Sequence, residues 1–283
     1  MLTILLFLPF LIAEKAYDQV NEEAKYLFKR YKNALRDKNR DEILGVLNET
    51  FKLTHCYRKE TYDRMDIIEH LKILPDGMIH IDEPRFENAR FEDGLILDFI
   101  AKLGDRAEIH FRAKRINFRY AIFQQVEKNC KGDVPLTAMI NYEKTVEAIG
   151  KRVMTSYVNA ISQRSLPKLY ALFDGSYHFK YCDTTYGTYY DKTFKNFDLK
   201  MPFYHKDDDH ETYQTEIRNG RMTSTGSAGF VVFGGGFDNY FEVSRKWENN
   251  AYGYSIDFDK DLRCYSEVPT NLNFFKLQYS VFE

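Results

Sequence analysis

The segment YKNALRDKNRDEILGVLNETFKLTHC, residues 31–56, is repeated at residues 157–182 as YVNAISQRSLPKLYALFDGSYHFKYC, an offset of 126. The Tyr, the Asn, the Ala and the final Cys are identical, and most apolar positions of one segment fall on apolar positions of the other. Towards the ends the offset becomes 134, where RYAIFQQVEKNCKGDVP at residues 119–135 lies over GYSIDFDKDLRCYSEVP at residues 253–269. Matching starts and ends predict an internal duplication of one domain design.

The duplication divides the chain into two predicted domains, residues 14–135 and residues 136–269. Residues 1–13 precede them, and a strand-like tail, residues 270–283, follows. The second copy is eight residues longer than the first and carries three successive glycines, residues 234–236, which predict a longer hairpin there. Two domains also agree with the usual domain size of roughly 100–200 residues.

Composition excludes several classes of protein. Hydrophobic residues make up 44% of the chain and aromatic residues 16%, which is enough to form a folded core and excludes a disordered chain. The 40 basic and 42 acidic residues leave a net charge of -2. Without a basic surplus the chain has no field to attract nucleic acid, so we expect no nucleic-acid partner.

An apolar run, LTILLFLPFLIA, occupies residues 2–13. Twelve helical residues span only about 18 Å, too short for a bilayer core of about 30 Å, so we expect no membrane span. The run is typical of a secretory signal peptide cleaved after Ala13, and a buried N-terminal helix is the alternative. We therefore expect a secreted, extracellular protein, in which the sequon at Asn48 is a candidate glycosylation site.

Four cysteines, Cys56, Cys130, Cys182 and Cys264, allow three disulfide pairings. Since each copy holds one early and one late cysteine, pairing within copies is the simplest arrangement, Cys56 with Cys130 and Cys182 with Cys264. Four free buried thiols are the alternative.

Each copy reads as helices followed by strands. Residues 18–37 and 146–160 repeat apolar residues at three- and four-residue steps, which predicts amphipathic helices. Short helical segments and alternating strands follow, and Asp63 and Asp191 are candidate N-caps of a third helix in each copy. The order of elements predicts an α+β fold, in which N-terminal helices pack on a curved antiparallel sheet.

This helical opening, the short strand after it and a curved sheet ending in Tyr-x-Ile resemble the nuclear transport factor 2-like superfamily, whose fold is an α+β cone. As a tandem form with paired cysteines, the chain looks most like secreted nematode-type proteins of unassigned activity. The resemblance implies a pocket inside each cone. The superfamily also includes enzymes such as ketosteroid isomerase. Enzymes of this kind often carry a catalytic Asp near the point of the strand where this chain has His55 in the first copy and Tyr181 in the second.

Strand alternation predicts which side chains face such a pocket. One face of the first strand of each copy is apolar, and its residues are the candidate ligand-binding set: Phe51, Leu53, His55, Tyr177, Phe179 and Tyr181. His55 is the single candidate catalytic residue, because a neutral imidazole can act as a general base near pH 7. A hydrogen-bonded core histidine is the alternative.

Other chemistry is not indicated. The cluster HKDDDHE at residues 205–211 fits no standard zinc motif, and a solvated acidic loop explains it better. No nucleotide, hydrolase or metalloprotease motif occurs, so we expect neither a metal nor a cofactor.

Together these observations favour a secreted tandem-domain protein that binds a small apolar ligand or a protein partner and is not catalytic. One alternative is a lyase or isomerase that uses His55 as general base. The other is a structural protein whose two domains pack as an internal pseudo-dimer with closed pockets.

Overall fold

The computed structural model describes residues 2–56, 60–131, 134–183, 188–193, 216–223, 226–234, 237–246 and 253–261. The side chains of residues 2–17 and of several positions in the later strands lie outside this description. The chain divides into two compact units. The first holds residues 1–152 with the short segments 220–228 and 244–254, and the second holds the remainder.

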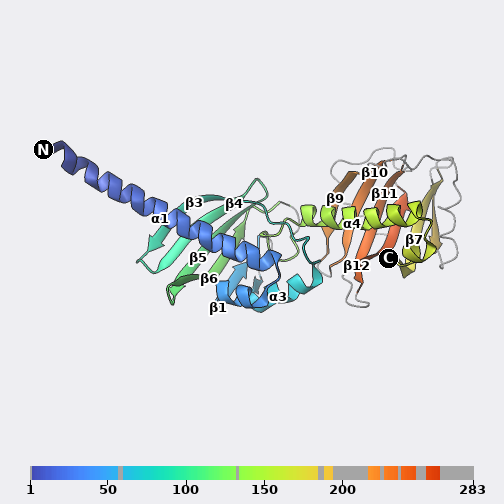
Figure 1. Ribbon diagram of the computed structural model, residues 1–283, viewed down its shortest axis with the longest axis horizontal. Helices are drawn as coiled ribbons and strands as arrows, with labels where there is room; N and C mark the ends of the chain where they lie inside the picture. Colours follow the sequence, from blue (N-terminus) through green and yellow to red (C-terminus); the bar gives the residue numbers. More distant parts are fainter. Residues whose placement is uncertain are drawn as a thin grey trace. The chain divides into compact units, whose positions relative to one another are not determined.

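The first unit contains a six-stranded sheet in the order β2-β1-β6-β5-β4-β3 (Figure 1). Its strands are β1 (Leu47–Thr54), β2 (Thr61–Tyr62), β3 (Arg85–Glu92), β4 (Ile96–Leu103), β5 (Ala107–Ile116) and β6 (Arg119–Lys128). The sequence predicted an antiparallel sheet, but β1 and β6 pair in parallel, with Leu53 opposite Gln125. Parallel neighbours need a long crossover, which β2 to β5 and their connections supply. The sheet is therefore mixed, and the predicted α+β class is confirmed.

Helices α1 (Leu2–Arg36), α2 (Arg40–Val46) and α3 (Arg64–Ile73) belong to this unit, and α1 lies across the sheet (Figure 1). Asp63 caps α3 as predicted, because its side chain accepts hydrogen bonds from the backbone amides of Met65 and Asp66. Helix α1 continues through Ala13, so cleavage there stays a prediction. Among the described residues, no helix is both long enough and apolar enough to cross a membrane.

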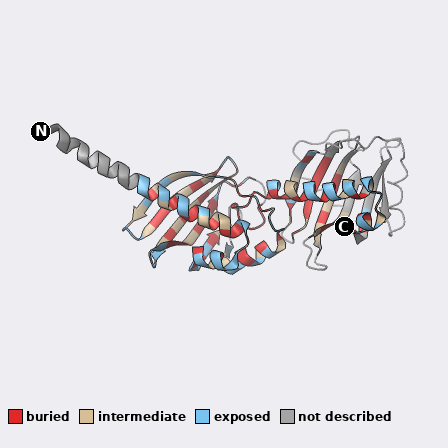
Figure 2. Cartoon of the chain, in the orientation of Figure 1, coloured by how far each residue is buried: buried red, intermediate tan, exposed pale blue. Residues whose placement is uncertain are grey.

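The core of the first unit lies between α1 and the sheet (Figure 2). Phe99 and Phe111 are opposite each other on neighbouring strands and stack with ring centroids 5.1 Å apart. Phe28 of α1 meets Phe111 edge to face at 6.0 Å, and Tyr31 meets it at 6.3 Å. Large aromatic side chains from helix and sheet thus fill the space that a cone would otherwise leave open.

The second unit repeats the strand order in its own sheet, β8-β7-β12-β11-β10-β9. The strands are β7 (Phe173–Asp183), β8 (Thr188–Thr193), β9 (Glu216–Met222), β10 (Ala228–Gly234), β11 (Phe237–Lys246) and β12 (Gly253–Asp261). As in the first sheet, the first and last long strands, β7 and β12, pair in parallel. The domain boundaries drawn from the sequence stay predictions.

Helices α4 (Tyr142–Ser162) and α5 (Leu166–Tyr170) precede the second sheet. The predicted N-cap at Asp191 is wrong: this residue lies within β8, opposite Lys180 of β7. Strand pairing has overridden the local capping signal there. The acidic cluster at residues 205–211, Gly235, Gly236 and the tail 270–283 lie outside the described residues.

Cys56 and Cys130 form a disulfide, with Cα atoms 6.0 Å apart, which confirms the pairing predicted for the first copy. Cys56 follows β1 and Cys130 follows β6, so the bond joins the ends of two neighbouring parallel strands. Cys264 lies outside the described residues, so the second pairing stays a prediction.

We predict that replacing both Cys56 and Cys130 by alanine lowers the free energy of unfolding by about 4 kcal/mol, because the bond closes a loop of 74 residues in the unfolded chain. Urea unfolding of the oxidised wild type and the double variant measures the difference. A loss below about 1 kcal/mol would show that the unfolded chain is not significantly restricted by this bond.

Candidate functional site

The predicted ligand-binding face of the first domain is part of its core. Phe51 and Leu53 are fully buried, and His55 is 3% exposed, while Lys52 between them is exposed. The predicted alternation is therefore confirmed. Tyr177 is buried in the second unit, and the side chains of Phe179 and Tyr181 lie outside the described set.

His55 uses its Nε2 atom to donate a hydrogen bond to the backbone carbonyl of Val134, 2.9 Å away. A carbonyl oxygen only accepts, so this nitrogen carries the proton. The same atom cannot accept a proton from a substrate in this arrangement. The contact matches the hydrogen-bonded core histidine that the sequence offered as the alternative.

Val134 belongs to a stretch that follows β6, residues 134–141, which we call the closing segment. Every residue of it is buried. The closing segment is attached to the sheet by Glu127 of β6, whose Oε1 atom accepts hydrogen bonds from the Thr137 hydroxyl at 2.5 Å and the Ala138 amide at 2.8 Å. The segment that spans the predicted domain boundary, between residues 135 and 136, is thus packed within the first unit.

A chain of polar groups extends this attachment towards α1. The Gln125 amide nitrogen donates to Glu127 at 2.7 Å and to the Thr137 hydroxyl at 3.1 Å. The Tyr31 hydroxyl of α1 donates to the Gln125 carbonyl oxygen at 3.2 Å. Helix, sheet and closing segment are therefore connected by one buried hydrogen-bond network, in which unpaired groups would be costly.

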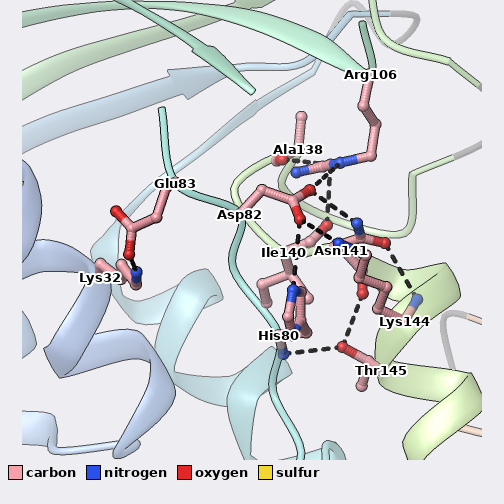
Figure 3. Close-up of polar contacts among 10 residues, drawn as sticks. All are labelled: Lys32, His80, Asp82, Glu83, Arg106, Ala138, Ile140, Asn141, Lys144 and Thr145. Carbon is pink, nitrogen blue, oxygen red and sulfur yellow. Dashed lines mark hydrogen bonds and ion pairs between the residues drawn. The ribbon is translucent and has the colours of Figure 1, made fainter. Parts of the chain in front are cut away.

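Asp82 holds the other end of the closing segment (Figure 3). Its carboxylate accepts from the Asn141 side chain at 2.7 Å, from Lys144 at 2.9 Å and from Arg106 at 3.2 Å. Arg106 also donates to the Ala138 carbonyl at 2.6 Å. Burial raises the pKa of Asp82, but hydrogen bonds from Lys144 and Asn141 and the charge of Arg106 outweigh it and lower that pKa to about 2.

For Glu127, in contrast to Asp82, the effect of burial on the pKa outweighs the hydrogen bonds and the nearby charge. Burial raises its pKa to about 7, although its hydrogen bonds with Thr137, Ala138 and Gln125 and the charge of Arg106 favour the ionised form. Burial also raises the pKa values of Tyr31 and Tyr142, and the nearby Glu127 charge raises both further. Glu127 is therefore the group of this network that changes its charge near neutral pH.

A carboxylate oxygen of Glu127 and the sulfurs of Cys56 and Cys130 lie within 4.8 Å of one another. These atoms are donors of the kind that bind zinc. The two sulfurs are joined in a disulfide and offer no thiolate, so the oxidised protein has no zinc site here.

An open groove of about 510 Å³ lies outside the core of the first unit. One wall is α1 and the other is the turn from β5 into β6. Its lining residues are Gln19, Glu22, Glu23, Tyr26, Leu27, Arg30, Phe118, Arg119 and Tyr120. Tyr26 is 58% exposed and Phe118 is 89% exposed, so two aromatic rings stand in solvent beside the acidic and basic residues of the lining.

The β5–β6 turn holds Phe118 in an unfavourable conformation. Ile116 pairs with Arg119, which leaves Asn117 and Phe118 as a two-residue turn. Both have positive φ, 46° and 67°, as in a type I′ turn. Asn suits this conformation, but glycine is favoured at the second position and a bulky side chain there is strained. The turn therefore exposes an aromatic ring at a cost in conformational energy.

Asn48, the predicted glycosylation site, is 8% exposed, and its Oδ1 atom accepts from the Thr50 amide at 3.0 Å and the Thr50 hydroxyl at 2.8 Å. Glycosylation stays a prediction.

The sequence did not identify Glu127, the closing segment or Phe118 as candidate site residues. For Phe118 a signal was present, because Asn-Phe stands where Asn-Gly is usual between two strands.

No protein-family model matches the chain, and no curated protein sequence matches it. Several solved structures match part of the chain. An NTF2-like protein from Silicibacter pomeroyi is 14% identical with a TM-score of 0.31, over 40% of this chain and 97% of that one. One from Cytophaga hutchinsonii is 9% identical with a TM-score of 0.31, over 38% of this chain and 96% of that one.

A de novo designed protein with a curved β-sheet is 16% identical with a TM-score of 0.29, over 38% of this chain and 97% of that one. The chain resembles NTF2-like proteins. The nematode-type aspect of the resemblance drawn from the sequence stays a prediction.

We predict that Glu127 makes the first domain less stable as the pH rises. Its pKa is raised from 4.5 to about 7 on folding, so the stability gained by the neutral form is complete below pH 4.5 and is lost as the pH rises through 7. The loss amounts to at most about 3 kcal/mol. Urea unfolding of the wild type and Glu127→Gln between pH 5 and pH 8 measures it.

Glu127→Gln should remove this part of the pH dependence while keeping one acceptor oxygen for Thr137 and Ala138. Glu108→Gln, on neighbouring β5, is the matched control and should follow the wild type. Parallel curves for the wild type and Glu127→Gln would contradict the assignment.

Proposed function

We propose that this chain is a secreted, tandem-domain binding protein that captures a protein partner on the outer groove of its first domain. The observation that carries the proposal is Phe118, an aromatic residue held in solvent by a strained two-residue turn. Strained backbone conformations that stabilise no other part of a fold are concentrated at functional positions.

The filled interior supports a partner outside the core rather than a small apolar ligand within it. Phe51 and Leu53 have no exposed surface, and the closing segment is buried against His55, Gln125 and Glu127. A ligand in the first cone would have to displace the closing segment. An enzyme that uses His55 as general base would have to accept the proton at Nδ1, because Nε2 is engaged with Val134.

The groove favours a short peptide segment of a protein. Tyr26 and Phe118 offer rings to an apolar side chain, and Arg30 and Arg115 lie over these rings at 6.0 and 5.9 Å. Glu22 and Glu23 on one wall and Arg119 on the other can hydrogen-bond to a peptide backbone. Aromatic residues and arginines of this kind contribute most of the binding energy at protein interfaces.

Secretion is supported by the apolar run at residues 2–13 and by the disulfide, which persists in oxidising compartments. An intact-mass measurement of the protein released by expressing cells tests it. We expect a chain that begins near Glu14 with all four cysteines oxidised. A chain retained in the cells with residues 2–13 attached would contradict secretion.

We predict that Phe118→Gly raises the free energy of unfolding by about 1 kcal/mol, because glycine relieves the left-handed conformation. The same variant should lose the partner. Partner capture is read by placing a photoreactive benzoylphenylalanine at Tyr26 and identifying adducts formed in the medium of the expressing cells. Urea unfolding gives the stability.

Met65→Ser is the matched control, since Met65 is another exposed apolar residue, on α3. It should leave the adduct unchanged. An adduct that forms equally with Phe118→Gly would refute the groove as the binding surface. A lower free energy of unfolding for Phe118→Gly would show that Phe118 stabilises the fold.

A further inference from the structure

The surroundings of the Cys56–Cys130 disulfide differ between its two sulfurs. Cys56 is half-buried, whereas Cys130 is 4% exposed. A thiolate from solution attacks the sulfur that it can reach, so attack on this bond falls on Cys56. Cys130 is then the leaving group, and a thiolate released in a buried site is unfavourable because burial disfavours its charge.

Glu127 is placed to relieve that charge. One of its carboxyl oxygens lies within 4.8 Å of both sulfurs. Its Oε1 atom accepts from Gln125, Thr137 and Ala138, and its buried Oε2 atom has no hydrogen-bond partner among the described residues. With Oε1 fully engaged, Oε2 is the oxygen that carries the proton of the neutral acid.

We propose that Cys56–Cys130 is a thiol–disulfide exchange centre that oxidises a dithiol, with Glu127 as the proton donor to the departing Cys130 sulfur. This activity goes beyond the binding function proposed above and does not depend on it. The three groups come from the ends of β1 and β6, which the parallel pairing brings together.

The exchange proceeds in two steps. One thiolate of the dithiol attacks Cys56 Sγ, the bond between Cys56 and Cys130 breaks, and Cys130 leaves with the electron pair. Cys130 takes the proton of Glu127 and becomes a thiol. The second thiolate of the dithiol then attacks the mixed disulfide and releases Cys56. The dithiol is oxidised to a disulfide, and the protein disulfide is reduced by two electrons.

Loss of its proton leaves Glu127 as an anion that already accepts three hydrogen bonds, so little rearrangement is needed. The charged and titratable groups around it are His55 at the end of β1, the strand paired with β6, Arg106 from the β4–β5 turn, Tyr31 from α1 and Tyr142 from α4. Both tyrosine pKa values are raised far above neutrality, and Arg106 stays charged. The Nε2–H of His55 is donated to Val134, so Glu127, whose Oε2 has no hydrogen-bond partner among the described residues, is the group placed to supply the proton.

The test is the rate at which dithiothreitol reduces this bond in the full, oxidised chain between pH 5.5 and pH 8.5. Acid quenching, alkylation and peptide mass spectrometry report Cys56 and Cys130 separately from the other two cysteines. The rate constant is divided by the fraction of reagent present as thiolate. We expect a constant value below pH 7 and a fall of about tenfold for each pH unit above it.

In Glu127→Gln, dithiothreitol should reduce the disulfide at least about tenfold more slowly at pH 6. The thiolate-corrected rate constant of this variant should show no change near pH 7. Glu108→Gln is the matched control and should keep the wild-type profile. Equal thiolate-corrected rates for the wild type and Glu127→Gln across the range would overturn the role of Glu127.

If Glu127→Gln does not fold, two measurements on the wild type test the same reaction. Glutathione, a monothiol, should be trapped as a mixed disulfide on Cys56, and trapping on Cys130 would overturn the order of attack. The rate should also rise linearly with dithiothreitol concentration. A plateau would show that the bond reacts only after the domain opens, which would overturn an exchange centre in the folded protein.

Discussion

The first domain depends on the attachment of the closing segment, residues 134–141, to the carboxyl group of Glu127. One oxygen of that carboxyl accepts from Thr137 and Ala138, and through Gln125 the same network reaches Tyr31 of α1. The segment has no helix or strand of its own to satisfy its backbone. Because buried amides need partners, the acidic side chain takes the place of a neighbouring strand. A carboxyl group buried for this purpose is expected to titrate near neutrality, and Glu127 does.

Because the interior is closed, a binding or reaction site of this domain has to lie elsewhere. Phe28, Tyr31 and the stacked pair Phe99–Phe111 pack inside the cone, and the closing segment is buried beside the sheet. His55, a polar group that a ligand would meet there, is hydrogen-bonded to Val134 of the closing segment. The proposed binding site is therefore on the outer surface, where Phe118 stands in solvent. The proposed reaction site is the disulfide beside Glu127, where a reagent attacks Cys56.

Much of the fold could be predicted because its signals are local or repeated. Alternation placed Phe51, Leu53 and His55 on the buried face, and the duplication chose the pairing of Cys56 with Cys130 among three possibilities. The parallel pairing of β1 with β6 could not be predicted, since no turn connects these strands. Asp191 failed as a cap because pairing with β7 decided its conformation. Glu127 reads as one more charge in QQVEKN, and only the returning segment 134–141 shows why it is buried.

Hydrogen exchange of the closing segment tests the central claim that this segment is part of the first domain's core. The amides of Ala138, Met139 and Ile140 donate to Glu127, to the Thr137 hydroxyl and to the Thr137 carbonyl, respectively. We expect all three to exchange at least about a thousandfold more slowly than in an unstructured chain, close to the slowest amides of β5 and β6. Exchange at the rate of an unstructured linker would contradict a closed interior.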